Sequence, residues 1–109
     1  MLSSGSLAST ALINSQAGVR YTIALTDAAR LVVFGNASSV AVTLPAATTS
    51  GYGAGFSFDV QNKGPGVVTI TPSGGTINNA AALPIAANRG CSITSDGVNY
   101  QVSLCTALP

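Results

Sequence analysis

Short stretches of alternating apolar and polar residues, separated by turns rich in glycine and proline, run through most of the chain. In FSFDVQ, the residues Phe56, Phe58 and Val60 fall on one side of an extended chain, and the polar residues between them fall on the other. VAVTL at 40–44 and VVTIT at 67–71 repeat this spacing. Turn signals recur roughly every 8–12 residues, which is typical of all-β domains. The sequence therefore predicts an all-β protein.

The strand and turn pattern predicts an antiparallel β-sandwich or a jelly-roll-like barrel of about eight to nine short strands. Asn-Lys-Gly-Pro-Gly at 62–66 is expected to be a hairpin loop, and Asp96-Gly97 the two-residue turn of the last hairpin. A phosphate-binding loop is not expected, because Lys63 precedes its glycines and a β-branched run follows them. The glycines are interpreted as residues that turn the chain.

Charge is the unusual part of the composition. Charged residues make up 6% of the 109 residues and the net charge is +1, whereas about 25% is ordinary for a soluble protein. A hydrophobic content of 47% argues against disorder. The absence of a basic patch argues against a nucleic-acid partner, and no apolar run approaches the roughly 18 residues of a membrane span. A surface with so few charges is poorly soluble by itself, which favours its being covered by neighbouring copies or by a larger assembly.

The chain is expected to form one domain at 20–109, preceded by an extended N-terminal arm at 1–19. The arm is rich in Ser, Thr and Ala, and it lacks the basic segment and the continuous apolar segment of a secretion signal. We interpret it as a segment that lies against a partner. Its candidate partner-binding residues are Leu2, Leu7, Leu12 and Ile13.

Catalytic chemistry is not expected. Histidine is absent, which removes the commonest general base and metal ligand. Asp27 and Asp96 are placed in turns, and Asp59 lies on the polar side of its strand, so each carboxylate has a structural explanation. Lys63, the one candidate base for a serine nucleophile, is placed on an open loop where it is solvated. No enzyme activity, cofactor or metal is therefore predicted.

The register of the last hairpin also predicts how Cys91 and Cys105 lie relative to each other. With a two-residue turn at Asp96-Gly97, Cys91 faces Val102, and Cys105 lies beyond the paired region on the opposite face. A direct cross-strand disulfide is then not expected, because facing Cβ atoms must lie close together. Two interpretations stay open: a pair of small buried apolar residues, or a cross-link between subunits.

The three tyrosines could form a binding surface. Tyr52 lies in Ser-Gly-Tyr-Gly-Ala-Gly, where flexible glycines are expected to expose it to a glycan or a protein partner. Tyr21 and Tyr100 alternate with polar neighbours and are interpreted as packing residues. Tyr52 is therefore a further candidate partner-binding residue.

The order of strands and turns from Tyr21 to Tyr100 resembles a module of tailed-bacteriophage virion proteins, which include tail fibres and head decorations. The resemblance is carried by VAVTLPAATTSGYGAGFSFDVQNKGPGVVTITPSGGTIN and by LPIAANRGCSITSDGVNY. In similar modules the aromatic residue after Asn99 is often Trp, where this chain has Tyr100, and the two cysteines are not part of the pattern. The resemblance implies a non-enzymatic structural protein on the outer surface of the particle, assembled as a homotrimer.

Two functions follow from the resemblance. The first is a capsid decoration (cement) protein whose partner is the major capsid protein, with the arm lying across neighbouring shell subunits. The alternative is a small tail-fibre or baseplate module that contacts tail proteins or a host-surface glycan. A hydrolytic tail protein is disfavoured, because the sequence lacks the required acid and base.

Overall fold

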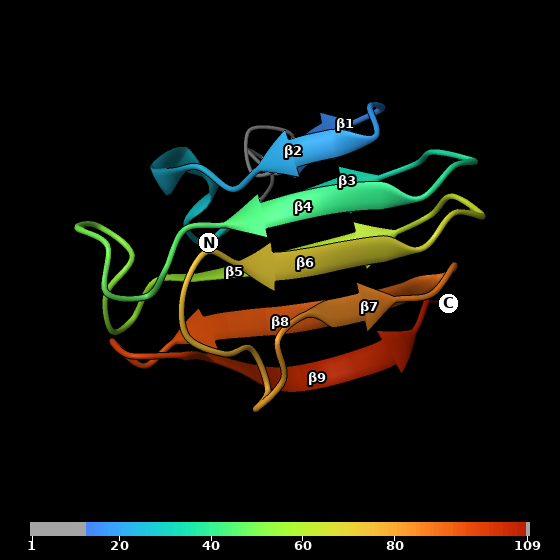
Figure 1. Ribbon diagram of the computed structural model, residues 1–109. Coiled ribbons are helices and arrows are strands. Elements are labelled where there is room, and N and C mark those ends of the chain that lie inside the picture. Colours follow the sequence, from blue (N-terminus) through green and yellow to red (C-terminus); the bar gives the residue numbers. More distant parts are fainter. Residues whose placement is uncertain (1–12, 109) are drawn as a thin grey trace.

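The computed structural model describes residues 13–108 of the chain. This part of the chain contains nine strands in two sheets and one short 3₁₀ helix, η2 (Leu25–Asp27) (Figure 1). The all-β prediction and the expected number of strands are therefore confirmed. The strands are β1 (Ile13–Gln16), β2 (Arg20–Thr22), β3 (Leu31–Phe34), β4 (Val40–Leu44), β5 (Ser57–Asn62), β6 (Val68–Pro72), β7 (Leu83–Ile85), β8 (Arg89–Ser95) and β9 (Tyr100–Ala107).

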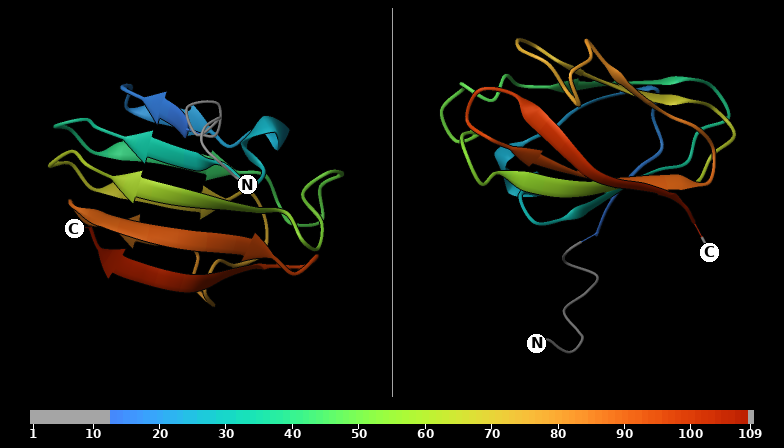
Figure 2. Two further views of the ribbon diagram at one scale, coloured as in Figure 1. Left: turned by 180° about the vertical axis from the view of Figure 1, so that it is seen from behind. Right: turned by 90° about the horizontal axis from the view of Figure 1, so that it is seen from below.

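The first six strands alternate between the two sheets. The five-stranded sheet has the order β1-β3-β5-β8-β9 and the four-stranded sheet the order β2-β4-β6-β7 (Figure 1). Within each sheet, the strands among these six run parallel to one another. The chain therefore winds from one sheet to the other and back, so that 13–72 form a parallel coil, seen from its end in the right-hand view of Figure 2.

The last three strands, β7 to β9, complete the two sheets and run antiparallel to the strands they join. β7 lies antiparallel to β6, β8 antiparallel to β5, and β9 antiparallel to β8. We name 83–107 the antiparallel end. The predicted antiparallel arrangement is thus correct for these three pairings and wrong for the four pairings of the parallel coil.

The antiparallel prediction is wrong for the parallel coil because the connecting loops, and not the strand residues, set the direction of neighbouring strands. Alternating side chains show which residues of a strand face the core, but not the direction of the neighbouring strand. The segment 62–66, expected to close a hairpin, instead leads from β5 in one sheet to β6 in the other. Among the described residues, β8 and β9 form the one hairpin that the sequence places correctly.

Glycines at 64 and 66 let successive turns of the parallel coil stack closely. The N–H of Gly66 donates to the carbonyl of Asn36 at 3.1 Å, and Asn36 Nδ2 donates to the carbonyl of Ala17 at 2.8 Å. A Cβ built on Gly64 would overlap the backbone of Asn36, and one on Gly66 would overlap the backbone of Ser38. The glycines therefore do more than turn the chain: they permit contact between backbones.

The core lies between the two sheets and follows the alternation in the sequence. Val40, Val42 and Leu44 of β4 are buried, as are Phe58 and Val60 of β5. The core also contains one polar residue at the end of β5: Asn62 is fully buried and donates hydrogen bonds to the carbonyls of Gly66 and Ile85. The Asn62 amide thereby ties β5 to the loop before β6 and to β7.

The predicted N-terminal arm lies partly outside the described residues. Leu2, Leu7 and Leu12 fall in that part of the chain. From residue 13 the predicted arm belongs to the sheet instead, because Ile13–Gln16 is β1 and pairs with β3. Ile13 lies opposite Leu31 in this pairing.

Candidate functional site

The outward-facing side of the five-stranded sheet is the broadest candidate surface. Along one line across the sheet, the register places Ile13 beside Leu31, Leu31 beside Asp59, Asp59 beside Ser92 and Ser92 beside Leu104. Their sequence neighbours Val32, Val60 and Ile93 are buried in the core, so the line itself faces outward. We name this surface the outer face; its members are Ile13, Leu31, Val33, Asp59, Gln61, Gly90, Ser92, Leu104, Thr106 and Leu108.

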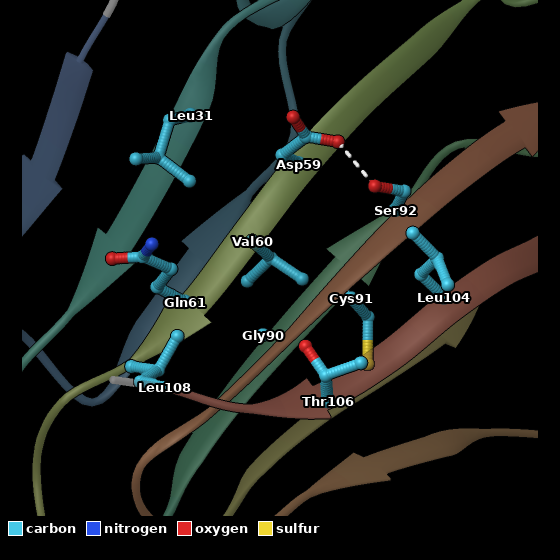
Figure 3. A pocket seen from close by; sticks show the side chains of 10 residues that line it. All are labelled: Leu31, Asp59, Val60, Gln61, Gly90, Cys91, Ser92, Leu104, Thr106 and Leu108. Carbon is cyan, nitrogen blue, oxygen red and sulfur yellow. Dashed lines mark hydrogen bonds between the residues drawn. The ribbon is translucent and has the colours of Figure 1, made fainter.

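A shallow depression of about 240 Å³ lies in the outer face, over β3, β5, β8 and β9 (Figure 3). Gly90 lacks a side chain there, and Leu108 and Gln61 lie close to the space a Cβ would take. Ser92 Oγ donates a hydrogen bond to Asp59 Oδ1 at 2.7 Å along one wall of the depression. Leucines and a threonine supply most of the remaining lining.

The outer face presents mainly neutral groups around its depression. Asp59 is the one ionisable side chain among the residues that line the depression, since Cys91 is in a disulfide. Neutral polar groups and leucines at a partly exposed surface are ordinary constituents of protein–protein contacts.

A buried carboxylate joins the first two strands of the parallel coil. Asp27 is 2% exposed and accepts hydrogen bonds from Tyr21 Oη at 2.6 Å, Asn14 Nδ2 at 2.9 Å and the N–H of Ala24 at 2.9 Å. Asn14 Nδ2 also donates to Tyr21 Oη at 2.7 Å, and Gln16 Nε2 donates to Asn14 Oδ1 at 2.8 Å. Asp27 was predicted to lie in a turn, and it does so in η2.

This network has an electrostatic consequence for Tyr21. Burial, then the hydrogen bond to Asp27 and the charge of Asp27, together raise the pKa of Tyr21 to about 12, although the hydrogen bond from Asn14 lowers it somewhat. Sequence reasoning missed the network, because Asn14, Tyr21 and Asp27 are brought together only by the crossing from β1 to β2 and η2. The polar groups of the network form hydrogen bonds with one another, so we interpret the network as a structural element.

Asp96 lies in the turn of the β8–β9 hairpin, as predicted. Its Oδ1 accepts hydrogen bonds from the N–H groups of Val98 and Asn99, and its Oδ2 accepts one from Gln101 Nε2. The bond from the Asn99 backbone, followed by those from Gln101 and Val98, lowers the pKa of Asp96. Within 13–108, no three acidic, histidine or cysteine side chains gather where a metal ion could bind.

The two cysteines form a disulfide within the chain, which corrects both interpretations of the sequence. The hairpin turn spans four residues, 96–99, so Ser95 pairs with Tyr100. A bulge at Ser103 of β9, opposite the step from Ser92 to Ile93, then shifts the register by a further residue and places Cys91 opposite Cys105. Free buried thiols and a cross-link between subunits are both wrong, because each sulfur is already bonded.

Tyr52 is buried rather than exposed. Its side chain is 8% exposed, its hydroxyl donates to the carbonyl of Ile23 at 3.0 Å, and its ring packs against Phe56 with a centroid distance of 4.8 Å. The glycines around it fold the loop back onto the core instead of presenting the ring. The expected exposure of Tyr52 is therefore wrong, and the ground for treating it as a binding residue is removed.

Tyr100 and Tyr21 pack as predicted. Tyr100 is fully buried, and its hydroxyl donates to the carbonyl of Pro45. Tyr21 is partly buried against Phe34, with ring centroids 6.0 Å apart. Of the candidate partner-binding residues, Ile13 alone is both described and exposed, at 45%, and it lies at the β1 edge of the outer face.

Within residues 13–108, no helix is long and apolar enough to cross a membrane. No protein-family model matches the sequence. No curated protein is similar to it at a significant level.

Proposed function

We propose that the protein is a non-enzymatic structural protein of a tailed-bacteriophage particle, and that it binds the outer surface of the assembled capsid as a decoration protein. The observation that supports this proposal is the outer face, a broad surface with leucines, neutral polar groups and one carboxylate. The partner would be the major capsid protein. The resemblance of residues 21–100 to virion modules supplies the class of particle.

The proposal also concerns the fold. We propose that the two facing sheets form a β-sandwich whose first half is wound as a parallel coil. An arm at the N-terminus would extend from β1 across neighbouring shell subunits. The outer face begins at the same strand, so the arm and the face would contact the shell together.

The mechanism would be mass action. A protein that binds the assembled shell but not the separated subunits stabilises the shell by RT ln(1 + [L]/Kd) at each site. With free protein at about 100 times Kd, this amounts to about 2.7 kcal/mol per site. The effect would be summed over the many equivalent sites of a capsid, and it requires no catalytic group.

The number of copies per particle tests the proposal. Quantitative mass spectrometry of purified particles, scaled to the major capsid protein, is expected to give hundreds of copies. A few to a few tens of copies would instead support the tail-fibre or baseplate alternative, which has lost its candidate glycan residue with the burial of Tyr52. Absence from particles would overturn both.

Removal of 1–12 tests the arm separately. This deletion leaves β1 in place, whereas removal of 1–19 would also remove a strand of the five-stranded sheet. The shortened protein is expected to keep the circular dichroism and melting temperature of the full chain and to lose most of its capsid occupancy. Unchanged occupancy would show that the arm does not contribute.

A further inference from the structure

The four sheet edges of the described chain differ in how well they are protected. β2 spans three residues and carries Arg20, β7 spans three and carries Pro84, and β1 spans four. β9 spans eight residues, YQVSLCTA, with neither charge nor proline. Short strands, charges and prolines are the ordinary means of preventing contact at a sheet edge. β9 has none of these. It does carry a bulge, a further means of protection, near its middle at Ser103, so its unprotected part is residues 104–107.

Most of the free side of β9 is open. Tyr100 exchanges backbone hydrogen bonds with Thr76 and Asn78 on this side. Within the described residues, no other segment pairs with the remainder of the strand (Figure 1). The Cα atoms of Cys91 and Cys105 are 4.1 Å apart, the close spacing of a non-hydrogen-bonded antiparallel pair. The N–H and carbonyl of Cys105 therefore point to the open side.

The disulfide holds this open segment in place. Residues 103–107 are all exposed, so burial alone does little to fix them on β8. The bond from Cys91 to Cys105 anchors the segment just after the bulge. An extended, uncharged strand fixed covalently at the sheet margin is a ready template for a further strand.

Charge favours a second copy of this chain as that strand, in antiparallel orientation. Arg89 lies beside one end of β9, opposite Ala107, and Asp96 lies beside the other end, in the turn before Tyr100. Antiparallel pairing of two copies turns the Arg89 end of each strand toward the Asp96 end of its partner. Parallel pairing would set like charges together. Twofold pairing is also self-complementary and closes on itself.

We propose that two copies of the protein pair antiparallel through residues 104–107 of β9, beyond the bulge, joining their five-stranded sheets into one continuous sheet. Leu104, which is 63% exposed, then packs near its counterpart across the twofold axis. This inference is independent of capsid binding and concerns the purified protein. It gives a dimer, in contrast to the homotrimer that the resemblance implies.

Sedimentation velocity of the full, oxidised chain up to about 100 µM tests the pairing. A species of twice the 10.7 kDa chain mass is expected. L104K is expected to raise the dissociation constant at least about tenfold, because two like charges then meet at the axis. V98K is the matched control: Val98 is equally exposed, at 63%, and lies in the same hairpin but in its turn. It should dimerise as the wild type does.

An equimolar mixture of L104K and L104E guards against a folding defect. Each variant alone is expected to be monomeric, and the mixture is expected to dimerise again through the opposite charges. A monomeric or trimeric wild type would overturn the proposal. So would equal behaviour of L104K and V98K, or a mixture that stays monomeric although circular dichroism shows both variants folded.

Discussion

The parallel coil and the antiparallel end of this protein reach the same two-sheet arrangement by different means. In the coil, each of the strands β1 to β5 is followed by a crossing to the other sheet. Its register is set where the backbones of successive turns touch, at Gly64 and Gly66. In the antiparallel end, β8 and β9 are sequence neighbours, and register is set by a four-residue turn, a bulge and the Cys91–Cys105 bond. Close backbone contact and covalent linkage thus serve the same purpose in the two halves.

Loss of the disulfide is expected to have the largest effect, and to act on the antiparallel end. The bond closes a loop with a sequence separation of 14. A loop of this size is worth about 3 kcal/mol in the chain-entropy model. Replacing Cys91 and Cys105 together by alanine should lower the free energy of unfolding by about that amount, as measured by urea denaturation. A change below about 1 kcal/mol would show that the noncovalent contacts of β8 and β9 suffice.

Gly66→Ala should have the next largest effect, and should act on the coil. The added Cβ overlaps the backbone of Ser38, so the stacked turns must separate, at an expected cost of about 2 kcal/mol. Gly35→Ala is the matched control in the neighbouring turn, since a Cβ there meets nothing within 4 Å. Equal urea midpoints for the two variants would contradict the stacking.

Tyr21→Phe should have a smaller effect, because it removes one hydroxyl from the Asp27 network. Asp27 keeps its bonds from Asn14 and Ala24, so a loss of about 1 kcal/mol is expected at neutral pH. Differential scanning calorimetry of the variant against wild type measures it. A variant as stable as wild type would show that the network adds nothing to the coil.

Alkaline titration sharpens the same point. The pKa of Tyr21 is raised to about 12 in the folded protein, against about 10 unfolded. Stability from keeping the hydroxyl neutral is therefore complete below about pH 10 and is lost as the pH rises toward 12. Tyrosinate absorbance should appear only well above pH 10 in the native protein. The pKa of Tyr100 is also raised to about 12, mainly by burial. Its tyrosinate absorbance should therefore also appear only well above pH 10.

Asp96→Ala should have the smallest effect, since its carboxylate is exposed in the hairpin turn. The pKa of Asp96 is lower in the folded protein than in the unfolded chain. Its contribution to stability is therefore present above the pKa of the unfolded chain, and it is lost as the pH falls through the pKa of the folded protein. A small decrease in melting temperature at pH 7, vanishing in acid, is expected. A large decrease at pH 7 would place Asp96 among the principal supports of the β8–β9 hairpin.

The sequence predicted the strands well because side-chain alternation reports burial directly. Val40, Val42 and Leu44 face the core as their spacing indicates, and so do Phe58 and Val60. Strand direction was not predictable in this way, because the same alternation suits parallel and antiparallel neighbours. The turn residues at 62–66 suit a hairpin and a crossing equally.

The candidate site was less predictable for the same kind of reason. The disulfide depends on one bulge and two extra turn residues, and neither leaves a mark in the composition of β8 or β9. Tyr52 was misplaced because glycines permit a loop to fold inward as readily as outward. The outer face emerges only when β3, β5, β8 and β9 are set side by side in register.

Nuclear Overhauser contacts between Hα protons test most directly that a parallel coil is joined to an antiparallel end. Non-hydrogen-bonded antiparallel pairs bring facing Hα protons together, whereas parallel neighbours do not. A strong Hα–Hα contact is expected between Cys91 and Cys105, and none between Val42 and Ile70, which face each other in β4 and β6. A strong Hα–Hα contact between β4 and β6 would contradict the parallel coil.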